Sequence, residues 1–161
     1  MSAAIEIRDY DDADEAALIG LIRQLQAHEG QYYDRMLPPD EIAGWYVDAL
    51  RQDCRQHAGH IRMACIGGKV EGYCATLTRV EADDVDEIPY WYAYVSELAV
   101  AEKARGNGVG KALLADSERL ARAAGARWLR VSVLTRNTLA HEVYRSYGFA
   151  DRLLNMEKPL T

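Results

Sequence analysis

The sequence has few of the features that mark several classes of protein. It contains only 3 cysteines, Cys54, Cys65 and Cys74, without a C-x-x-C spacing. We therefore expect neither disulfides nor a zinc site, and we interpret these residues as reduced, buried thiols of a cytoplasmic protein. No apolar run approaches the length of a membrane span. Residues 1–6 lack a basic region followed by an apolar core, so no signal peptide is predicted.

Basic residues are also fewer than acidic ones. Lys and Arg number 19 against 25 Asp and Glu, which gives a net charge of −6. This balance argues against non-specific binding to nucleic acid or to an anionic membrane, and it slightly favours a cationic substrate. Residues 81–87 hold five carboxylates. Such a run is usually a solvated loop, and the alternative is a rim that attracts amines.

The chain is long enough for one domain with its own core, and we assign residues 1–161 to a single domain. Apolar periodicity and turn residues divide it into successive segments. Predicted strands lie near residues 5–8, 61–66, 70–78, 95–100, 128–134 and 153–156. Predicted helices lie near residues 12–29, 40–56, 111–124 and 138–147. The Gly67-Gly68 pair predicts a hairpin turn between the second and third strands.

The predicted order is strand, helix, helix, three strands, helix, strand, helix, strand. Strand–helix–strand units joined by short loops indicate an α/β protein with a mixed sheet and helices on both faces.

The most informative stretch is the glycine-rich turn at residues 105–110, which reads Arg-Gly-Asn-Gly-Val-Gly. It follows a predicted strand and begins a predicted helix. The first N–H groups of a helix have no partner within it, and glycines allow a ligand to approach the backbone closely. The turn could therefore hold an anion such as a pyrophosphate. By itself it could equally be an ordinary loop before a helix, and it fits neither the dinucleotide fingerprint nor the P-loop.

A second motif lies downstream, Asn137-x-x-Ala140-x-x-x-Tyr144-x-x-x-Gly148-Phe149, and Phe149 is the only phenylalanine of the chain. With the two motifs in this order, the sequence resembles the GNAT superfamily, the Gcn5-related N-acetyltransferases. The resemblance covers the whole chain in element order, and it is motif-specific from about residue 92 to residue 149.

The resemblance implies acetyl-CoA as donor, a primary amine as acceptor, no metal, and a splayed gap between the fourth and fifth strands for the pantetheine arm. It implies that the backbone of three strand residues pairs with the pantetheine amides: Leu98, Ala99 and Val100. It implies that the turn holds the pyrophosphate: Arg105, Gly106, Asn107, Gly108, Val109, Gly110 and Lys111. Asn137 and Tyr144 would line the far side of the thioester.

Elementary chemistry agrees with these assignments. A splayed strand has unpaired backbone groups that need partners, and a pantetheine arm carries two amides. A backbone N–H near Leu98 would stabilise negative charge on the thioester oxygen. Tyr144 would protonate or hydrogen-bond the leaving thiolate. The alternatives are that Tyr144 is a core aromatic, that Asn137 is only a helix N-cap, and that Arg105 only frames the turn.

Glu97 is the candidate general base, because a buried carboxylate has a raised pKa and could deprotonate an ammonium directly or through water. Some relatives place a catalytic glutamate where this chain has Ser132, which favours Glu97. The competing interpretation of Glu97 is a structural ion pair.

The sequence therefore predicts an N-acetyltransferase in which a small cationic amine attacks acetyl-CoA directly. Acceptance of a protein N-terminus or lysine, and a catalytically silent CoA-binding sensor, are the alternatives. We expect no nucleic acid and no membrane as partners, and a homodimer stays open.

Overall fold

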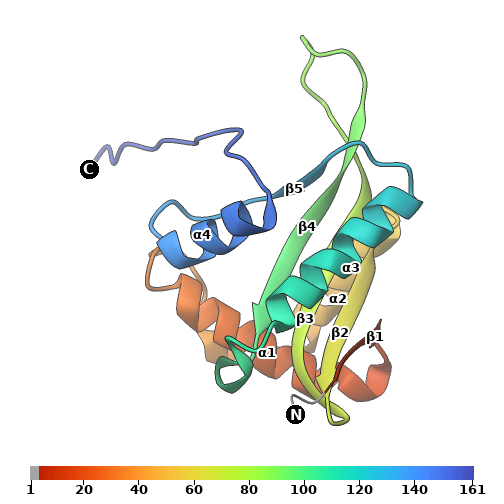
Figure 1. The fold of residues 1–161 in the computed structure, drawn as a ribbon. Coiled ribbons are helices and arrows are strands. Elements are labelled where there is room, and N and C mark those ends of the chain that lie inside the picture. Colours follow the sequence, from red (N-terminus) through yellow and green to blue (C-terminus); the bar gives the residue numbers. More distant parts are fainter. Residues whose placement is uncertain (1–3) are drawn as a thin grey trace.

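The computed structural model describes residues 4–161, and its centre is a five-stranded sheet in the order β1-β2-β3-β4-β5 (Figure 1). The first four strands pair antiparallel and β5 pairs parallel to β4. Their bounds are β1 Ile5–Asp9, β2 His60–Ile66, β3 Lys69–Glu81, β4 Trp91–Val100 and β5 Leu129–Val131. The fold class predicted from the sequence, a mixed α/β architecture, is confirmed.

Within residues 4–161, four α-helices cover the two faces of this sheet. They are α1 Glu15–Glu29, α2 Gly44–Gln56, α3 Val109–Ala123 and α4 Thr138–Tyr147. Successive side chains of a strand point to opposite faces. The hydroxyl of Tyr73 in β3 and that of Tyr46 in α2 both donate hydrogen bonds to the carboxylate of Glu97. The next residue of β3, Cys74, points the other way, and its sulfur lies 3.2 Å from the Ser117 hydroxyl of α3. Helices α2 and α3 therefore lie on opposite faces.

The remaining two helices complete these layers. Helix α1 packs beside α2, and its buried face is formed by Leu18, Leu21 and Ile22. The Tyr147 hydroxyl of α4 donates a hydrogen bond of 3.0 Å to Glu118 of α3, so α4 lies beside α3. The main core is apolar and continuous through both layers.

Several local predictions are confirmed. Gly67 and Gly68 have φ of 58° and 77°, as a tight hairpin turn between β2 and β3 requires. Helix α4 has the predicted bounds, and Gly148 ends it in the left-handed region with φ of 120°.

Other boundaries are corrected. The predicted helix at 40–56 begins only at Gly44, because Pro39 starts a separate 3-10 turn, Pro39–Glu41. The predicted strand at 128–134 is reduced to β5, Leu129–Val131. The predicted last strand at 153–156 is wrong: residues 149–161 form no helix or strand in the structure.

Residues 81–87 fall at the end of the β3–β4 hairpin that extends farthest from the body in Figure 1. Most of this loop is exposed, as a solvated run would be. Among residues 4–161, no helix is long and apolar enough to cross a membrane.

Candidate active site

The sheet opens between β4 and β5. The two strands pair only over three residues, from Ala93↔Leu129 to Val95↔Val131. Directly afterwards, the pairing of β3 with β4 skips Ser96 in a β-bulge. Bulges bend a strand and are frequent beside active sites. The bulge therefore marks the point at which β4 separates from β5, and residues 96–100 continue without a partner on that side within the described chain.

Leu98, Ala99 and Val100 lie in this separated part of β4. Each is paired in register with a residue of β3, from Cys74↔Leu98 to Gly72↔Val100. In an antiparallel pair, alternate residues turn their N–H and C=O groups away from the partner strand. Some backbone groups of these residues therefore face the opening and are available to an extended ligand.

The glycine-rich turn lies immediately beyond β4 and begins α3. Gly106 and Gly108 adopt φ of 79° and 83°, a conformation that favours glycine, and Gly108 is the N-cap of α3 without a side-chain hydrogen bond. Within residues 4–161, no recorded hydrogen bond uses the backbone N–H groups of residues 106–111. A row of free donors at a helix N-terminus is a site for an anion.

The start of α3 is held close to the sheet by Gly72 of β3. A Cβ atom on Gly72 would lie 2.9 Å from a Val109 methyl and 3.0 Å from the Ala99 carbonyl. In contrast, a Cβ on Gly110 would make only an ordinary contact of 3.7 Å with Val100. Internal packing thus requires a glycine at position 72, whereas position 110 has room for a Cβ atom.

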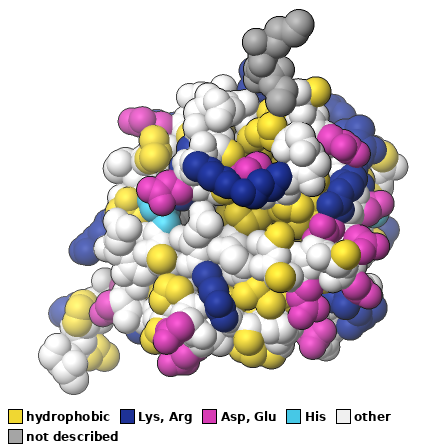
Figure 2. Space-filling model, turned by 90° about the horizontal axis from the view of Figure 1, so that it is seen from below, with side chains coloured by type: hydrophobic (Ala, Val, Ile, Leu, Met, Phe, Trp, Pro, Cys, Tyr) yellow, Lys and Arg dark blue, Asp and Glu magenta, His cyan; other side chains and the backbone are white. Residues whose placement is uncertain are grey.

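Arg105 and Lys111 border the turn, and both are exposed. The Arg105 Nε lies 3.4 Å from the Val100 carbonyl, so this side chain links the turn to the end of β4. Figure 2 views the molecule from the end at which the turn lies, and Lys and Arg side chains cross this face among acidic ones. The local charge suits an anion although the whole chain is acidic.

Glu97 lies at the opening of the sheet and faces α2. Its Oε1 accepts a hydrogen bond from the Tyr46 hydroxyl, and its Oε2 accepts one of 2.5 Å from the Tyr73 hydroxyl. Burial raises the pKa of Glu97 above its usual value, although the two tyrosine hydrogen bonds oppose this by stabilising the charged form. Among the described residues, no Lys or Arg forms an ion pair with Glu97, so the structural ion pair considered for it is not present.

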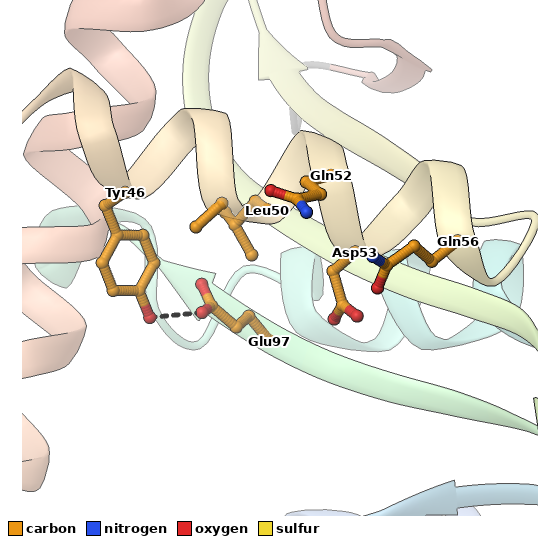
Figure 3. Close-up of a pocket in the computed structure, with 7 residues that line it drawn as sticks. Tyr46, Leu50, Gln52, Asp53, Gln56 and Glu97 are labelled. Atoms are coloured by element: carbon orange, nitrogen blue, oxygen red, sulfur yellow. Dashed lines mark hydrogen bonds between the residues drawn. The ribbon is translucent and has the colours of Figure 1, made fainter.

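An open pocket of about 380 Å³ lies between Glu97 and one side of α2 (Figure 3). Its other lining residues are Tyr46, Ala49, Leu50, Gln52, Asp53 and Gln56. In Figure 3 the carboxylates of Asp53 and Glu97 point into the same space below the helix. The pocket therefore offers one carboxylate fixed by tyrosines and a second that is more exposed.

Asn137 and Tyr144 belong to α4. Asn137 is buried and is the helix N-cap, because its side-chain oxygen accepts a hydrogen bond of 3.2 Å from the Ala140 N–H. Tyr144 is half-buried, and its ring meets that of Phe149 edge-on with centroids 5.7 Å apart. Burial raises the pKa of Tyr144 to about 12. Unlike the Tyr147 hydroxyl of the same helix, the Tyr144 hydroxyl forms no hydrogen bond within residues 4–161, so this group is available to a ligand.

Sequence reasoning did not identify Tyr46 and Tyr73 as site residues. Tyr46 reads as part of the apolar face of a helix, and Tyr73 as an ordinary strand aromatic. Both are distant from Glu97 in sequence, by 51 and 24 residues. The one sequence feature that could have indicated Tyr73 is its position in a predicted strand that neighbours the strand of Glu97.

The comparisons with known proteins agree with this architecture. The model of the acetyltransferase (GNAT) family matches residues 21–149. This chain belongs to the GNAT acetyltransferase family. A search of curated proteins found no match.

Solved structures show the same fold as this GNAT domain at low sequence identity. A mutant of the BH1408 protein from Bacillus halodurans is 20% identical with a TM-score of 0.82, covering 97% of this chain and 99% of that one. A Pyrococcus furiosus protein is 23% identical with a TM-score of 0.72, covering 98% of this chain and 100% of that one. The aminoglycoside N-acetyltransferase AAC(6')-Iy, solved in complex with CoA, is 17% identical with a TM-score of 0.69, covering 96% and 99%.

Proposed function

We propose that this GNAT protein transfers the acetyl group of acetyl-CoA to the primary amine of a small cationic acceptor. The observation that carries the proposal is Glu97, a half-buried carboxylate that two tyrosines hold at the opening of the sheet and at the border of a pocket. Such a group can accept a proton from an ammonium that enters the pocket.

The residues around the opening fit a CoA thioester. Acetyl-CoA supplies an activated acetyl group, a chain with two amides and a pyrophosphate. The free N–H groups of residues 106–111 suit the pyrophosphate, and Lys111 adds positive charge. The unpaired side of Leu98, Ala99 and Val100 suits the amides, in the manner of an added strand.

We assign the proton transfers to two residues. Glu97 takes a proton from the acceptor ammonium, directly or through water, and the freed nitrogen lone pair forms the new C–N bond as the C–S bond breaks. Tyr144 donates a hydrogen bond to the departing thiolate. A free thiol has a pKa of about 8.5, well below the value of about 12 for Tyr144. Stabilisation of the thiolate by a hydrogen bond is thus favoured over complete proton transfer. The acetylated nitrogen then releases its remaining extra proton to water.

Direct attack is favoured over an acetylated cysteine. All three cysteines are buried, and burial raises the pKa of Cys54 and Cys74 to about 11. Thiolates are therefore scarce at neutral pH. Incubation with acetyl-CoA and no amine should leave the intact mass of the protein unchanged. An acetylated protein that an amine then deacetylates would contradict direct attack.

The preference for a cationic acceptor is supported by Asp53 and Glu97 in one pocket and by the net charge of −6. AAC(6')-Iy, an aminoglycoside N-acetyltransferase, shares the fold. The test is CoA thiol release with a panel of polyamines, aminoglycosides, and peptides with a free N-terminus or lysine. Turnover of polyamines or aminoglycosides is expected. Turnover of peptides alone would assign the protein to the protein acetyltransferases, and tight CoA binding without any turnover would favour the sensor.

A further inference from the structure

The hairpin between β3 and β4 projects from the body and ends in a loop, residues 82–90, that lies away from the rest of the chain (Figure 1). We call residues 83–88 of this loop the tip. Two apolar side chains of the tip, Val85 and Ile88, are at least 84% exposed. Exposed apolar side chains gathered at one place mark an interaction site.

The tip is also acidic, and most of its charges have no partner in their own molecule. Three of its carboxylates form no ion pair within the described chain: Asp83, Asp84 and Asp86. The fourth, Glu87, lies 4.0 Å from Arg152. A turn in which the Glu87 N–H donates to the Asp84 carbonyl at 3.2 Å keeps these residues close together. A partner of the tip must therefore offer both apolar surface and positive charge.

The base of the same hairpin offers this combination in three residues that we call the shelf: Tyr90, Tyr92 and Arg130. The guanidinium of Arg130 lies 3.9 Å from the ring centroid of Tyr92 and 5.3 Å from that of Tyr90. Its Nη2 donates a hydrogen bond of 2.5 Å to the Tyr90 hydroxyl. All three side chains are partly exposed. Tyrosine and arginine are the residue types that protein interfaces favour.

Arg130 differs from comparable arginines in its lack of a counterion. Three other arginines of the described chain are partly buried, and each of them pairs with an aspartate: Arg8, Arg51 and Arg62. Within residues 4–161, Arg130 pairs with no carboxylate, and its one side-chain hydrogen bond goes to Tyr90. A guanidinium has five N–H donors. Several donors of Arg130 therefore stay free for a carboxylate from another molecule.

We propose that the tip of one molecule docks on the shelf of a second copy of this chain, and that the contact is reciprocal. Carboxylates of the tip pair with Arg130, while Val85 and Ile88 pack on the tyrosine rings. The hairpin carries each tip away from the shelf of its own molecule (Figure 1). This association goes beyond acetyl transfer and does not depend on it.

A second copy is favoured over an unrelated protein because each copy carries both complementary surfaces on one hairpin. When two such hairpins lie antiparallel about a two-fold axis, each tip lies beside the base of the other. Both contacts then form together, and the assembly closes as a dimer.

The first test is the mass of the full chain in solution, measured by light scattering at increasing concentration. A dimer of twice 18.0 kDa is expected. A protein that stays monomeric at all concentrations would overturn the proposal.

The second test reverses the charges of the two surfaces separately. Asp84→Lys with Asp86→Lys reverses the tip, and Arg130→Glu reverses the shelf. In either variant alone, both contacts of the dimer bring like charges together, so Kd should rise at least about tenfold. In an equal mixture, one contact pairs the introduced lysines with the introduced glutamate, and the other contact is that of the wild type. A dimer of the two variants should therefore form with a Kd within about threefold of the wild-type value.

The matched control is Asp40→Lys with Glu41→Lys, which changes the net charge equally at exposed positions of a separate 3-10 turn. It should dimerise like the wild type. Melting temperatures verify the folding of each variant. Because the tip substitutions lie in an exposed loop, they test the proposal even where Arg130→Glu lowers stability. A tip variant that dimerises like the control would overturn the proposal, and so would a mixture of folded variants that does not restore the dimer.

Discussion

The hydroxyl of Tyr73 lies 2.5 Å from Oε2 of Glu97, so a fully buried side chain of β3 donates a hydrogen bond to a carboxylate on the next strand. Tyr46 of α2 bonds the other oxygen. Each carboxylate oxygen can accept two hydrogen bonds, so one position on each stays free for a substrate proton. The two tyrosines fix the orientation of Glu97 and restrain the rise of its pKa that burial causes.

Removing the Tyr73 hydroxyl should therefore move the pH dependence of catalysis. Tyr73→Phe takes away a hydrogen bond to the charged form of Glu97, which raises the pKa of the base. Hydrogen bonds to charged groups contribute about 1.5 to 3 kcal/mol, and about 1.4 kcal/mol corresponds to one pH unit. The base must be unprotonated to act, so the acidic limb of kcat/KM should move about 1 to 2 units toward higher pH.

The matched control is Tyr94→Phe, because the Tyr94 hydroxyl on the neighbouring part of β4 bonds Ser132 at 3.0 Å and not Glu97. The acidic limb of kcat/KM for Tyr94→Phe should lie at the same pH as in the wild type. An unchanged limb in folded Tyr73→Phe would mean that Glu97 is not the group whose ionisation limits the rate.

Tyr144 gives a prediction about kcat. Tyr144→Phe keeps the ring against Phe149 and removes a hydroxyl that forms no hydrogen bond within residues 4–161, so stability should change little. The hydrogen bond to sulfur strengthens as charge develops there, so the loss should appear in kcat with little change in acetyl-CoA binding. General acid groups contribute about 10² to 10⁴-fold, and a thiolate is already a fair leaving group, so the lower end is expected.

Steady-state rates at saturating acetyl-CoA, with chemistry shown to be rate-limiting, measure this effect. A fall in kcat of less than about threefold, far below the general-acid range, would make Tyr144 a packing residue.

The glycine turn gives a prediction about donor binding. Replacing both Gly108 and Gly110 by bulkier residues should abolish CoA binding, because side chains would fill the approach to the helix N-terminus. The single change Gly110→Leu tests the same point where the backbone is helical and the added Cβ atom makes only an ordinary contact with Val100. Gly110→Ala is the control, since alanine is short and favours a helix by about 1 kcal/mol over glycine.

Calorimetric titration with CoA measures the binding of each variant. The account predicts near-normal affinity for Gly110→Ala and a large loss for Gly110→Leu. Equal CoA affinities of the two folded variants would contradict the binding of the pyrophosphate at this turn.

The features that could be predicted from the sequence are those fixed by local chemistry. The Gly67-Gly68 hairpin, the turn around Gly108 and the end of α4 at Gly148 all depend on backbone conformations that glycine favours. Apolar periodicity likewise predicts α3 and most strands. Glu97 could be proposed from its position beside the motif.

What could not be predicted depends on contacts between distant segments. The link from Tyr73 to Glu97 depends on the register of β3 on β4, which the bulge at Ser96 shifts. The pocket depends on where α2 crosses the sheet. The strand expected at 153–156 has the right local pattern, but a strand needs a partner edge, and residues 149–161 pair with no strand among residues 4–161. Periodicity reports which residues favour a strand and carries no information about the partner.

The most direct measurement of the central claim, that Glu97 is the base of an acetyl-CoA-dependent amine acetyltransferase, compares thiol release by wild type and Glu97→Gln with the best amine of the panel. Glutamine keeps the size of the side chain and cannot accept the ammonium proton. The account predicts a fall in kcat/KM of about 10² to 10⁴-fold at neutral pH, with CoA affinity by calorimetry unchanged. A folded Glu97→Gln protein that releases CoA within about threefold of the wild-type rate, well outside that range, would contradict it.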